Sequence, residues 1–163
     1  MGSNVPYEIK KGLMAYLKKA TFDDVLHVTK NMRDMDRNEC WLQTAQPVED
    51  LIKLAFISGG ENLTISNEEG KPVGLCGVSN TCRIWMVATD ELFSEKKDRL
   101  DLIKKGRIWV DNLLETHTLL YNFVYAENKP AIKWLKALGF SFINLHPLYG
   151  TFKKPFYEFV RIN

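Results

Sequence analysis

The chain has 163 residues, 45% hydrophobic and 12% aromatic, which is enough for one well-filled core and too few for two ordinary domains. The formal net charge is +2 and Lys and Arg form no long basic run, so the composition does not favour nucleic-acid binding. No stretch approaches the roughly 18 consecutive apolar residues of a membrane-spanning helix. We expect a single domain over residues 1–163, with residues 1–12 a flexible or tag-containing N-terminus.

The cysteines and the first residues of the chain favour a location in the cytoplasm. Cys40, Cys76 and Cys82 are odd in number and show no Cys-x-x-Cys spacing, which is typical of buried thiols in a reduced cytoplasmic protein. The start Met-Gly-Ser-Asn lacks the basic-then-apolar layout of a signal peptide. The three histidines fall on separate predicted elements, so we expect no metal site.

The chain begins with a predicted strand and helix. Residues 13–19 form the predicted strand, and Thr21 with Asp24 gives a capping arrangement for the turn that follows. A loose apolar stripe then predicts a helix to about residue 36.

A polar stretch follows over residues 37–46, and we expect it to be a loop between the first two helices. Pro47 suits the first position of the second helix, which Gly59 and Gly60 end.

Three short strands come next. Residues 63–66 and 72–78 flank an Asn-Glu-Glu-Gly turn over residues 67–70, and this pattern predicts a hairpin. The third run, residues 82–88, is almost continuously apolar and suits a central strand.

The last third begins with a long amphipathic helix, predicted over residues 96–115. Residues 121–125 then alternate as a strand should. Asn128 and Pro130 open a helix over residues 130–138 that Gly139 ends. Residues 141–145 and 156–161 supply two further strands. This order predicts an α+β fold with about four helices on a mixed, mostly antiparallel sheet of about six or seven strands.

Two segments carry a family resemblance. Asn128-x-x-Ala131 through Gly139-Phe140, and the strand Arg83-Ile-Trp-Met-Val-Ala-Thr-Asp90 before the long helix, resemble the GCN5-related N-acetyltransferase (GNAT) superfamily of acyl-CoA N-acyltransferases. Over residues 73–142 the chain is similar, more narrowly, to the small acetyltransferase-like internal-virion or morphogenesis proteins of tailed bacteriophages. The resemblance implies acetyl-CoA as co-substrate and an unidentified amine or protein acceptor, in the cytoplasm of the host cell.

The resemblance also assigns residues to acetyl-CoA. The end of a splayed strand would pair with the pantetheine arm, and the next helix start would face the pyrophosphate. For Ser94 and Glu95, and for Asn128, ordinary helix-capping roles are the alternative. The assigned residues are Met86, Val87, Ala88 and Thr89 for pantetheine, Ser94, Glu95, Lys96 and Lys97 for the pyrophosphate, and Asn128 for the far end of the cofactor.

The chain also departs from the family pattern. Residues 91–98 contain none of the glycines that bring a backbone close to phosphate, and Leu135 stands where many relatives have a proton-donating tyrosine. Tyr125 is a candidate acid, with ordinary strand packing as the alternative. The candidate bases are Asp90, Glu91 and Glu127, and an exposed loop charge is the alternative for each of them.

Two functions follow from these observations. One is an acetyl-CoA-dependent N-acyltransferase, phage-encoded, that transfers an acetyl group to an unidentified amine. The other is a catalytically inactive GNAT-like protein that acts in phage particle morphogenesis or host interaction and binds phage structural proteins. We expect neither nucleic acid nor a membrane as a partner.

Overall fold

The computed structural model describes residues 17–94 and 96–163; the side chains of residues 93 and 96–98 are not described. The predicted N-terminal segment 1–12 therefore lies outside the described residues, as does the start of the first predicted strand. The elements are, in chain order, β1 (Leu17–Lys19), α2 (Phe22–Lys30), α3 (Asp34–Thr44), α4 (Val48–Ile57), β2 (Glu61–Ser66), β3 (Pro72–Val78), β4 (Ile84–Ala88), the 3-10 helix η1 (Asp90–Phe93), α5 (Lys96–Leu114), β5 (Leu119–Tyr125), α6 (Lys129–Ala137), β6 (Ser141–Tyr149) and β7 (Lys154–Ile162).

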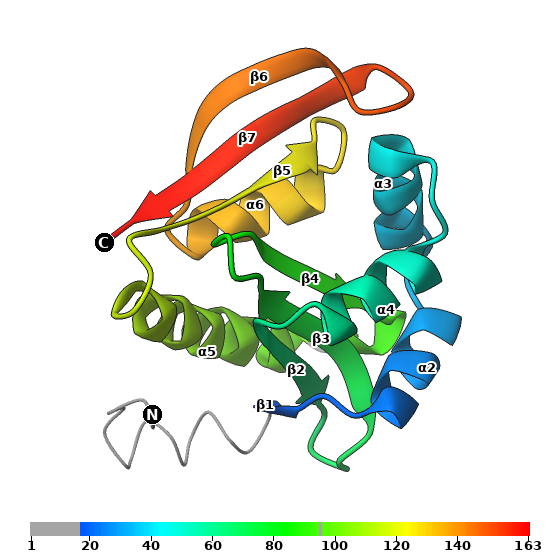
Figure 1. The fold of residues 1–163 in the computed structure, drawn as a ribbon. Coiled ribbons are helices and arrows are strands. Elements are labelled where there is room, and N and C mark those ends of the chain that lie inside the picture. The colour runs from blue at the N-terminus through cyan, green and yellow to red at the C-terminus, as the bar shows by residue number, and fades with distance from the viewer. Residues whose placement is uncertain (1–16, 95) are drawn as a thin grey trace.

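The described strands form two antiparallel sheets, which confirms the predicted α+β class. One sheet has the order β1-β2-β3-β4 and the other β5-β7-β6. Between β4 and β5 the structure has an isolated parallel bridge, Arg83 with Tyr121, where the Tyr121 N–H donates to the Cys82 carbonyl at 3.2 Å. The mixed sheet that we predicted is thus divided, because the parallel pairing around α5 is limited to this bridge. Figure 1 shows the two sheets diverging from it toward α3.

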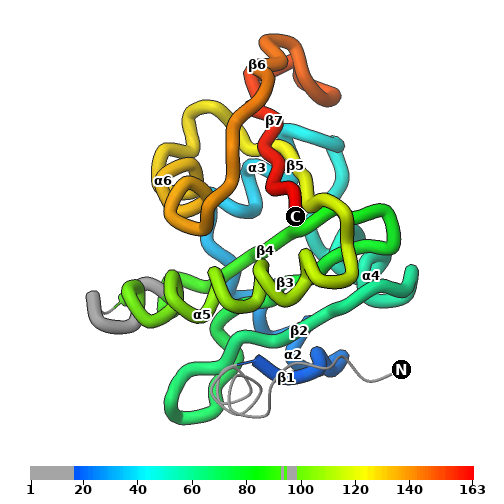
Figure 2. The backbone as a smooth tube through the Cα atoms, turned by 90° about the vertical axis from the view of Figure 1, so that its left-hand side faces the viewer, coloured from blue at the N-terminus to red at the C-terminus, as the bar shows by residue number. Residues whose placement is uncertain are grey.

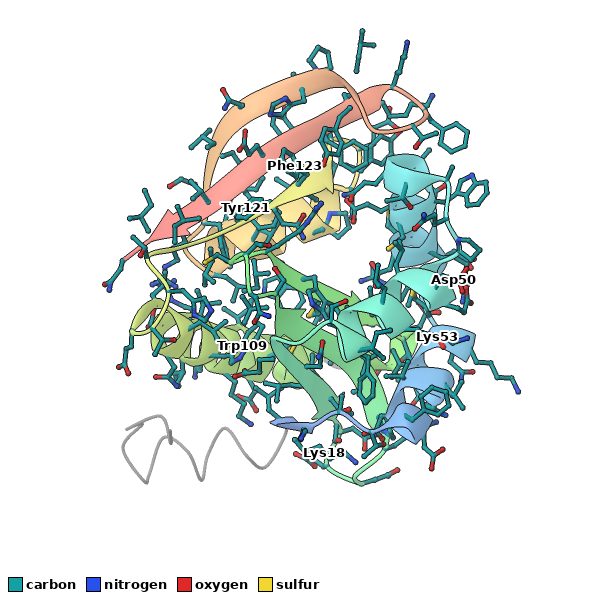
Figure 3. The ribbon with its side chains drawn as sticks, in the orientation of Figure 1. Lys18, Asp50, Lys53, Trp109, Tyr121 and Phe123 are labelled. Atoms are coloured by element: carbon teal, nitrogen blue, oxygen red, sulfur yellow. The ribbon has the colours of Figure 1, made fainter. Side chains whose placement is uncertain are left out.

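Buried side chains form two clusters, one on each face of the first sheet. The larger cluster joins α5 and α6 to both sheets and includes Val110 and Leu120, which are fully buried. Figure 2 shows α5 crossing this face. Trp109 projects from α5, and its indole N–H donates to Glu61 on β2 at 3.1 Å (Figure 3). The smaller cluster packs α2 and α4 against the other face of β3 and β4.

The predicted start of α2 and both predicted ends of α6 are confirmed, whereas Pro47 lies one residue before α4 rather than in its first position. Thr21 and Asp24 form a reciprocal capping box at the start of α2, with both bonds within 3.2 Å. The Asn128 side chain caps α6 by accepting from the Ala131 N–H at 3.3 Å. Gly139, which follows that helix, has a φ of +89°, a conformation that glycine adopts without steric cost.

The prediction of a single helix to residue 36 followed by a loop over residues 37–46 was wrong. The chain breaks at Met32, which forms an antiparallel bridge with Thr89, and then enters α3, a helix of 11 residues. None of the residues of α3 is fully buried, so the helix lacks the apolar stripe by which periodicity identifies helices. Its inward face is polar instead.

The hairpin of β6 and β7 is longer than predicted and reaches α3. β6 continues through Pro147. Proline has no backbone N–H, but β6 is an edge strand, where a residue can do without a hydrogen bond to a neighbouring strand. At the hairpin tip the Thr151 N–H donates to the Gln43 carbonyl at 3.1 Å. Gly150, with a φ of +74°, lies so close that a Cβ there would be 2.8 Å from the same oxygen. The tip is therefore held against the C-terminal end of α3.

Candidate functional site

The divergence of β4 and β5 leaves a gap, here called the split, within a cleft of about 1500 Å³. The Thr89 N–H donates to Val73 of β3, so the alternate residues Ile84, Met86 and Ala88 direct their backbone N–H and C=O groups away from β3 and toward the split. Side chains of α3, β5 and α6 line the same cleft. The split is therefore the place where this fold offers strand-edge hydrogen bonds to a ligand.

Most of these backbone groups on β4 already have partners within the chain. The Ile84 carbonyl accepts from Asn122 Nδ2 at 2.6 Å. The Ala88 N–H donates to Asp36 Oδ2 at 2.9 Å, and the Ala88 carbonyl accepts from the Arg33 N–H at 2.9 Å. For Met86 we find no partner among the described residues across the split. One residue of the β4 edge is thus open, and the next position is occupied by the start of α3.

The β5 side of the split is covered by α3 in the same way. Glu39 Oε1 accepts from the Tyr125 N–H at 2.5 Å, and Glu39 Oε2 accepts from Asn128 Nδ2 at 3.4 Å. Gln43 Nε2 donates to the Phe123 carbonyl at 3.4 Å. The Phe123 N–H donates to the Asn122 side chain of its own strand at 2.8 Å. The helix therefore binds β4 through one carboxyl group and β5 through the next.

The two carboxyl groups of α3 that bind the strands, those of Asp36 and Glu39, both have raised pKa values. Burial raises the pKa of Glu39 to about 7, although the hydrogen bond from Tyr125 opposes the rise. Burial also raises the pKa of Asp36, against the hydrogen bond from Ala88 and the charge of Arg33, while the charge of Asp90 adds to the rise. Glu39 is therefore a carboxyl group that gains and loses its proton near neutral pH, which is a property of many acid–base groups.

The predicted residues after β4 lie at the surface, in or next to η1. Asp90 and Glu91 are exposed to solvent where they line the cleft, and Glu91 pairs with Lys71 at 2.7 Å. The Ser94 hydroxyl donates to the Glu91 carbonyl at 3.0 Å. Glu95 lies outside the described residues. Lys96 and Lys97 begin α5, but their side chains are not described, so the structure does not place their charges.

The predicted residues after β5 are used locally. The Tyr125 hydroxyl donates to Glu127 at 3.0 Å on the surface, and this hydrogen bond raises the pKa of Tyr125. The pair lies outside the split, although the backbone of Tyr125 borders it. Asn128 is 2% exposed, and its side-chain oxygen and nitrogen are bonded to Ala131 and Glu39. Thr89 is also buried, with its hydroxyl 3.2 Å from the Val73 carbonyl. Met86, Val87 and Ala88 lie on β4 as expected.

The sequence analysis missed Asp36 and Glu39. Together with Gln43 they recur at i, i+3 and i+7, which is one face of a helix. That spacing could have indicated a helix, but a search for apolar periodicity does not detect it because the three residues are polar.

An aromatic group covers the outer side of the split. Phe123 stacks on Tyr149 with ring centroids 4.5 Å apart, and His146 meets Phe123 edge-on at 5.5 Å. His146 Nε2 lies 3.0 Å from Glu158 Oε2, and the Arg83 guanidinium lies 5.8 Å from the Phe123 ring. Figure 3 shows Tyr121 and Phe123 along β5. Phe123 projects from β5 and contacts the β6–β7 hairpin, so it forms the outer wall of the cleft.

Side chains that could bind a metal ion do not cluster within residues 17–94 and 96–163. In that part of the chain no group of three His, Cys, Asp or Glu side chains is arranged to hold a metal ion. None of the helices described there is both long and apolar enough to cross a membrane.

Solved structures place the chain in the acyltransferase fold class. A GCN5-related N-acetyltransferase from Kribbella flavida is 13% identical with a TM-score of 0.66, over 90% of this chain and 96% of that one. The ribosomal-protein-S18-alanine N-acetyltransferase from Escherichia coli is 16% identical with a TM-score of 0.63, over 90% and 92%. At these identities the likeness shows the fold, which is that of the GNAT superfamily.

A family model gives a narrower assignment than the likeness of folds. The chain belongs to the family described as "Bacteriophage T7, probable scaffold protein Gp13", whose model matches residues 62–147. The match runs from β2 into β6 and so includes both sides of the split. Among curated proteins no match was found.

Proposed function

We propose that this protein acts in phage particle assembly, as a structural module that keeps the acyltransferase fold without transferring acetyl groups. The observation that carries the proposal is the occupied strand edge at Ala88. A pantetheine arm binds this fold as an added strand would, through consecutive outward-facing backbone groups. Here Met86 is open, but Arg33 and Asp36 take both backbone groups of Ala88. With α3 in this position, acetyl-CoA does not fit the edge.

The expected pyrophosphate region gives further support. Residues 91–98 contain no glycine, and glycine is the residue that lets a backbone approach phosphate oxygens closely. Glu91 brings negative charge to this region and is paired with Lys71 rather than directed toward a phosphate site. The scaffold description of the family agrees with an assembly role.

Glu39 favours a second candidate, an acetyl-CoA-dependent N-acyltransferase. Its carboxyl group lies in the cleft, and its pKa of about 7 suits a base that takes a proton from an acceptor amine. Leu135 occupies the position of the proton-donating tyrosine, so water would have to protonate the departing thiolate. This candidate requires α3 to move away from Ala88.

A binding experiment separates the two candidates. We expect acetyl-CoA, titrated to about 1 mM, to give no heat of binding and no rise in the melting temperature, because the edge at Ala88 is closed. Binding tighter than roughly millimolar would refute the non-catalytic proposal.

A phage complementation experiment tests the role itself. In a phage that lacks this gene, we expect the wild-type protein and the Glu39→Gln variant to restore infectious particles equally, since the variant keeps the shape of the side chain and removes the base. Glu115→Gln, which changes an exposed carboxylate after α5, is the matched control. Failure of a folded Glu39→Gln variant alone would favour the enzyme instead.

A further inference from the structure

We infer that α3 is a latch across the split: Asp36 holds β4, Glu39 holds β5, and a ligand reaches the backbone of Ala88 only when α3 withdraws. The inference rests on the proposed function in one respect, because it takes the closed edge as the resting state. It goes further by identifying the chain segment that controls access.

The segment before α3 imitates an extended ligand. Met32 forms an antiparallel bridge with Thr89, and the Arg33 N–H donates to the Ala88 carbonyl at 2.9 Å. Asp36 then accepts from the N–H of the same residue. These are the bonds that an added strand would make with this edge. The latch and a strand-like ligand therefore compete for the same backbone groups.

The contacts that hold α3 are mostly polar, so moving the helix away from the strands costs little free energy. None of its residues is fully buried, whereas α2 buries four residues and α4 buries two. Few apolar contacts and a solvent-facing surface are the marks of a segment that opens locally. The N-terminal residue that caps α3, Arg33, makes no side-chain capping bond. The hydrogen bonds of Asp36 and Glu39 therefore provide much of what holds the N-terminal half of the helix to the strands.

The C-terminal end of α3 is held differently and can act as a pivot. The hairpin tip binds the Gln43 carbonyl through Thr151, and Trp41 packs on Phe152 with ring centroids 5.9 Å apart. On the opposite side Arg37 donates to Glu49 of α4 at 2.5 Å and also to the Thr29 carbonyl of α2. Opening would keep the hairpin contact and break the bonds of Arg37, Asp36 and Glu39.

The charges around the latch give its opening a pH dependence. Glu39 faces Asp36 on its own helix, and Asp36 faces Asp90 from η1 with Arg33 as the nearby cation. Cys40 beside them has its pKa raised to about 12, mainly by burial, and remains a neutral thiol. Ionisation of Glu39 therefore places a negative charge in the desolvated split, next to the carboxyl group of Asp36. The closed latch is favoured below pH 7 and weakened above it.

Backbone amide exchange measured by NMR tests the latch directly. We expect Asp36→Ala to accelerate exchange of the Ala88 amide at least tenfold, because its acceptor is removed, and Glu39→Ala to do the same for Tyr125. The Thr89 amide, bonded to Val73, is the internal reference, and Glu115→Ala is the control variant. Unchanged exchange at Ala88 in Asp36→Ala would overturn the inference. If that variant fails to fold, Asp36→Asn, which keeps an acceptor oxygen, should show a smaller acceleration at the same amide, and no acceleration there would also overturn it.

Acetyl-CoA serves as the probe ligand in a second arm of the experiment. We expect it to bind Asp36→Ala at least tenfold more tightly than it binds the wild type. Binding to the wild type while the Ala88 amide stays protected would overturn the latch, since no withdrawal was needed. The proposed function is tested separately, by whether the wild type binds acetyl-CoA at all.

Discussion

The substitution Glu39→Gln tests how protonation of the Glu39 carboxyl group affects the stability of the protein. Glu39 is held between the Tyr125 N–H and the Asn128 side chain, and burial raises its pKa from an ordinary 4.5 to about 7. Glutamine has nearly the same shape, stays neutral at every pH and keeps an oxygen for Tyr125. Its amide nitrogen would face the nitrogen of Asn128, which costs about 1 kcal/mol for one poorly made hydrogen bond.

The sign of the effect follows from proton linkage. Between pH 4.5 and about 7 the folded protein holds a proton on Glu39 that the unfolded chain has lost, so the free energy of unfolding falls as the pH rises. The two pKa values differ by about 2.5, and at about 1.36 kcal/mol for each pKa unit the loss is about 3 kcal/mol by pH 8. We expect Glu39→Gln to be nearly as stable as the wild type at pH 5, where the wild type has already lost about 0.8 kcal/mol of this contribution, and about 2 kcal/mol more stable at pH 8.

Urea unfolding at pH 5, 6, 7 and 8, followed by tryptophan fluorescence, measures these free energies. Asp36 also has a raised pKa and contributes a slope of the same sign in both proteins, so the comparison reports what Glu39 adds through its own titration and its coupling to Asp36. Asp24, Glu49 and Glu158 have lowered pKa values, so they act below this pH range. An unchanged slope in Glu39→Gln would refute the reasoning and show that the carboxyl group is ionised and solvated throughout.

Three further substitutions test the packing of the two sheets by the same urea assay. Asn122→Ala should lower the free energy of unfolding by about 2 kcal/mol, since it removes the bond to the Ile84 carbonyl between the two sheets; a loss below about 0.5 kcal/mol would contradict this role. Gly77→Ala should cost about 2 kcal/mol or more, because its Cβ would lie 2.2 Å from a backbone oxygen of β2, and a neutral result would contradict that packing. Phe156→Ala should cost about 3–5 kcal/mol, since Phe156 is fully buried, whereas the control Phe152→Ala, at an exposed site, should change stability by less than about 1 kcal/mol.

The sequence predicted the parts of the fold where local chemistry and burial agree. The segment from β5 through α6 to Gly139 combines strand alternation, the Asn128 cap and a helix-ending glycine. All three signals predict the same strand–turn–helix conformation, and the structure has it. α5 was found because Val110, Leu113 and Leu114 form an apolar stripe that the structure buries.

The sequence did not predict α3, and the reason is physical. Hydrophobic periodicity detects helices that bury apolar side chains, whereas α3 directs Asp36 and Glu39 inward to bind strand edges. Those edges exist only once β4 and β5 have diverged, which is a tertiary event that no local pattern encodes. The candidate bases Asp90, Glu91 and Glu127 were chosen by their closeness in sequence to the strand ends, and the structure places all three at the surface.

The lone bridge between Arg83 and Tyr121 also bears on how the chain acquires its fold. Each sheet comes from one continuous stretch of sequence, residues 17–88 in one and 119–162 in the other, and β2-β3, β3-β4 and β6-β7 are pairs joined by short loops. Short loops close quickly, so each sheet can form from its own hairpins. Docking the finished halves across α5 must then be the slow step, because little backbone pairing guides it. Refolding should accordingly pass through a state with two formed sheets and an unformed junction, visible as a rollover in the refolding rate at low denaturant.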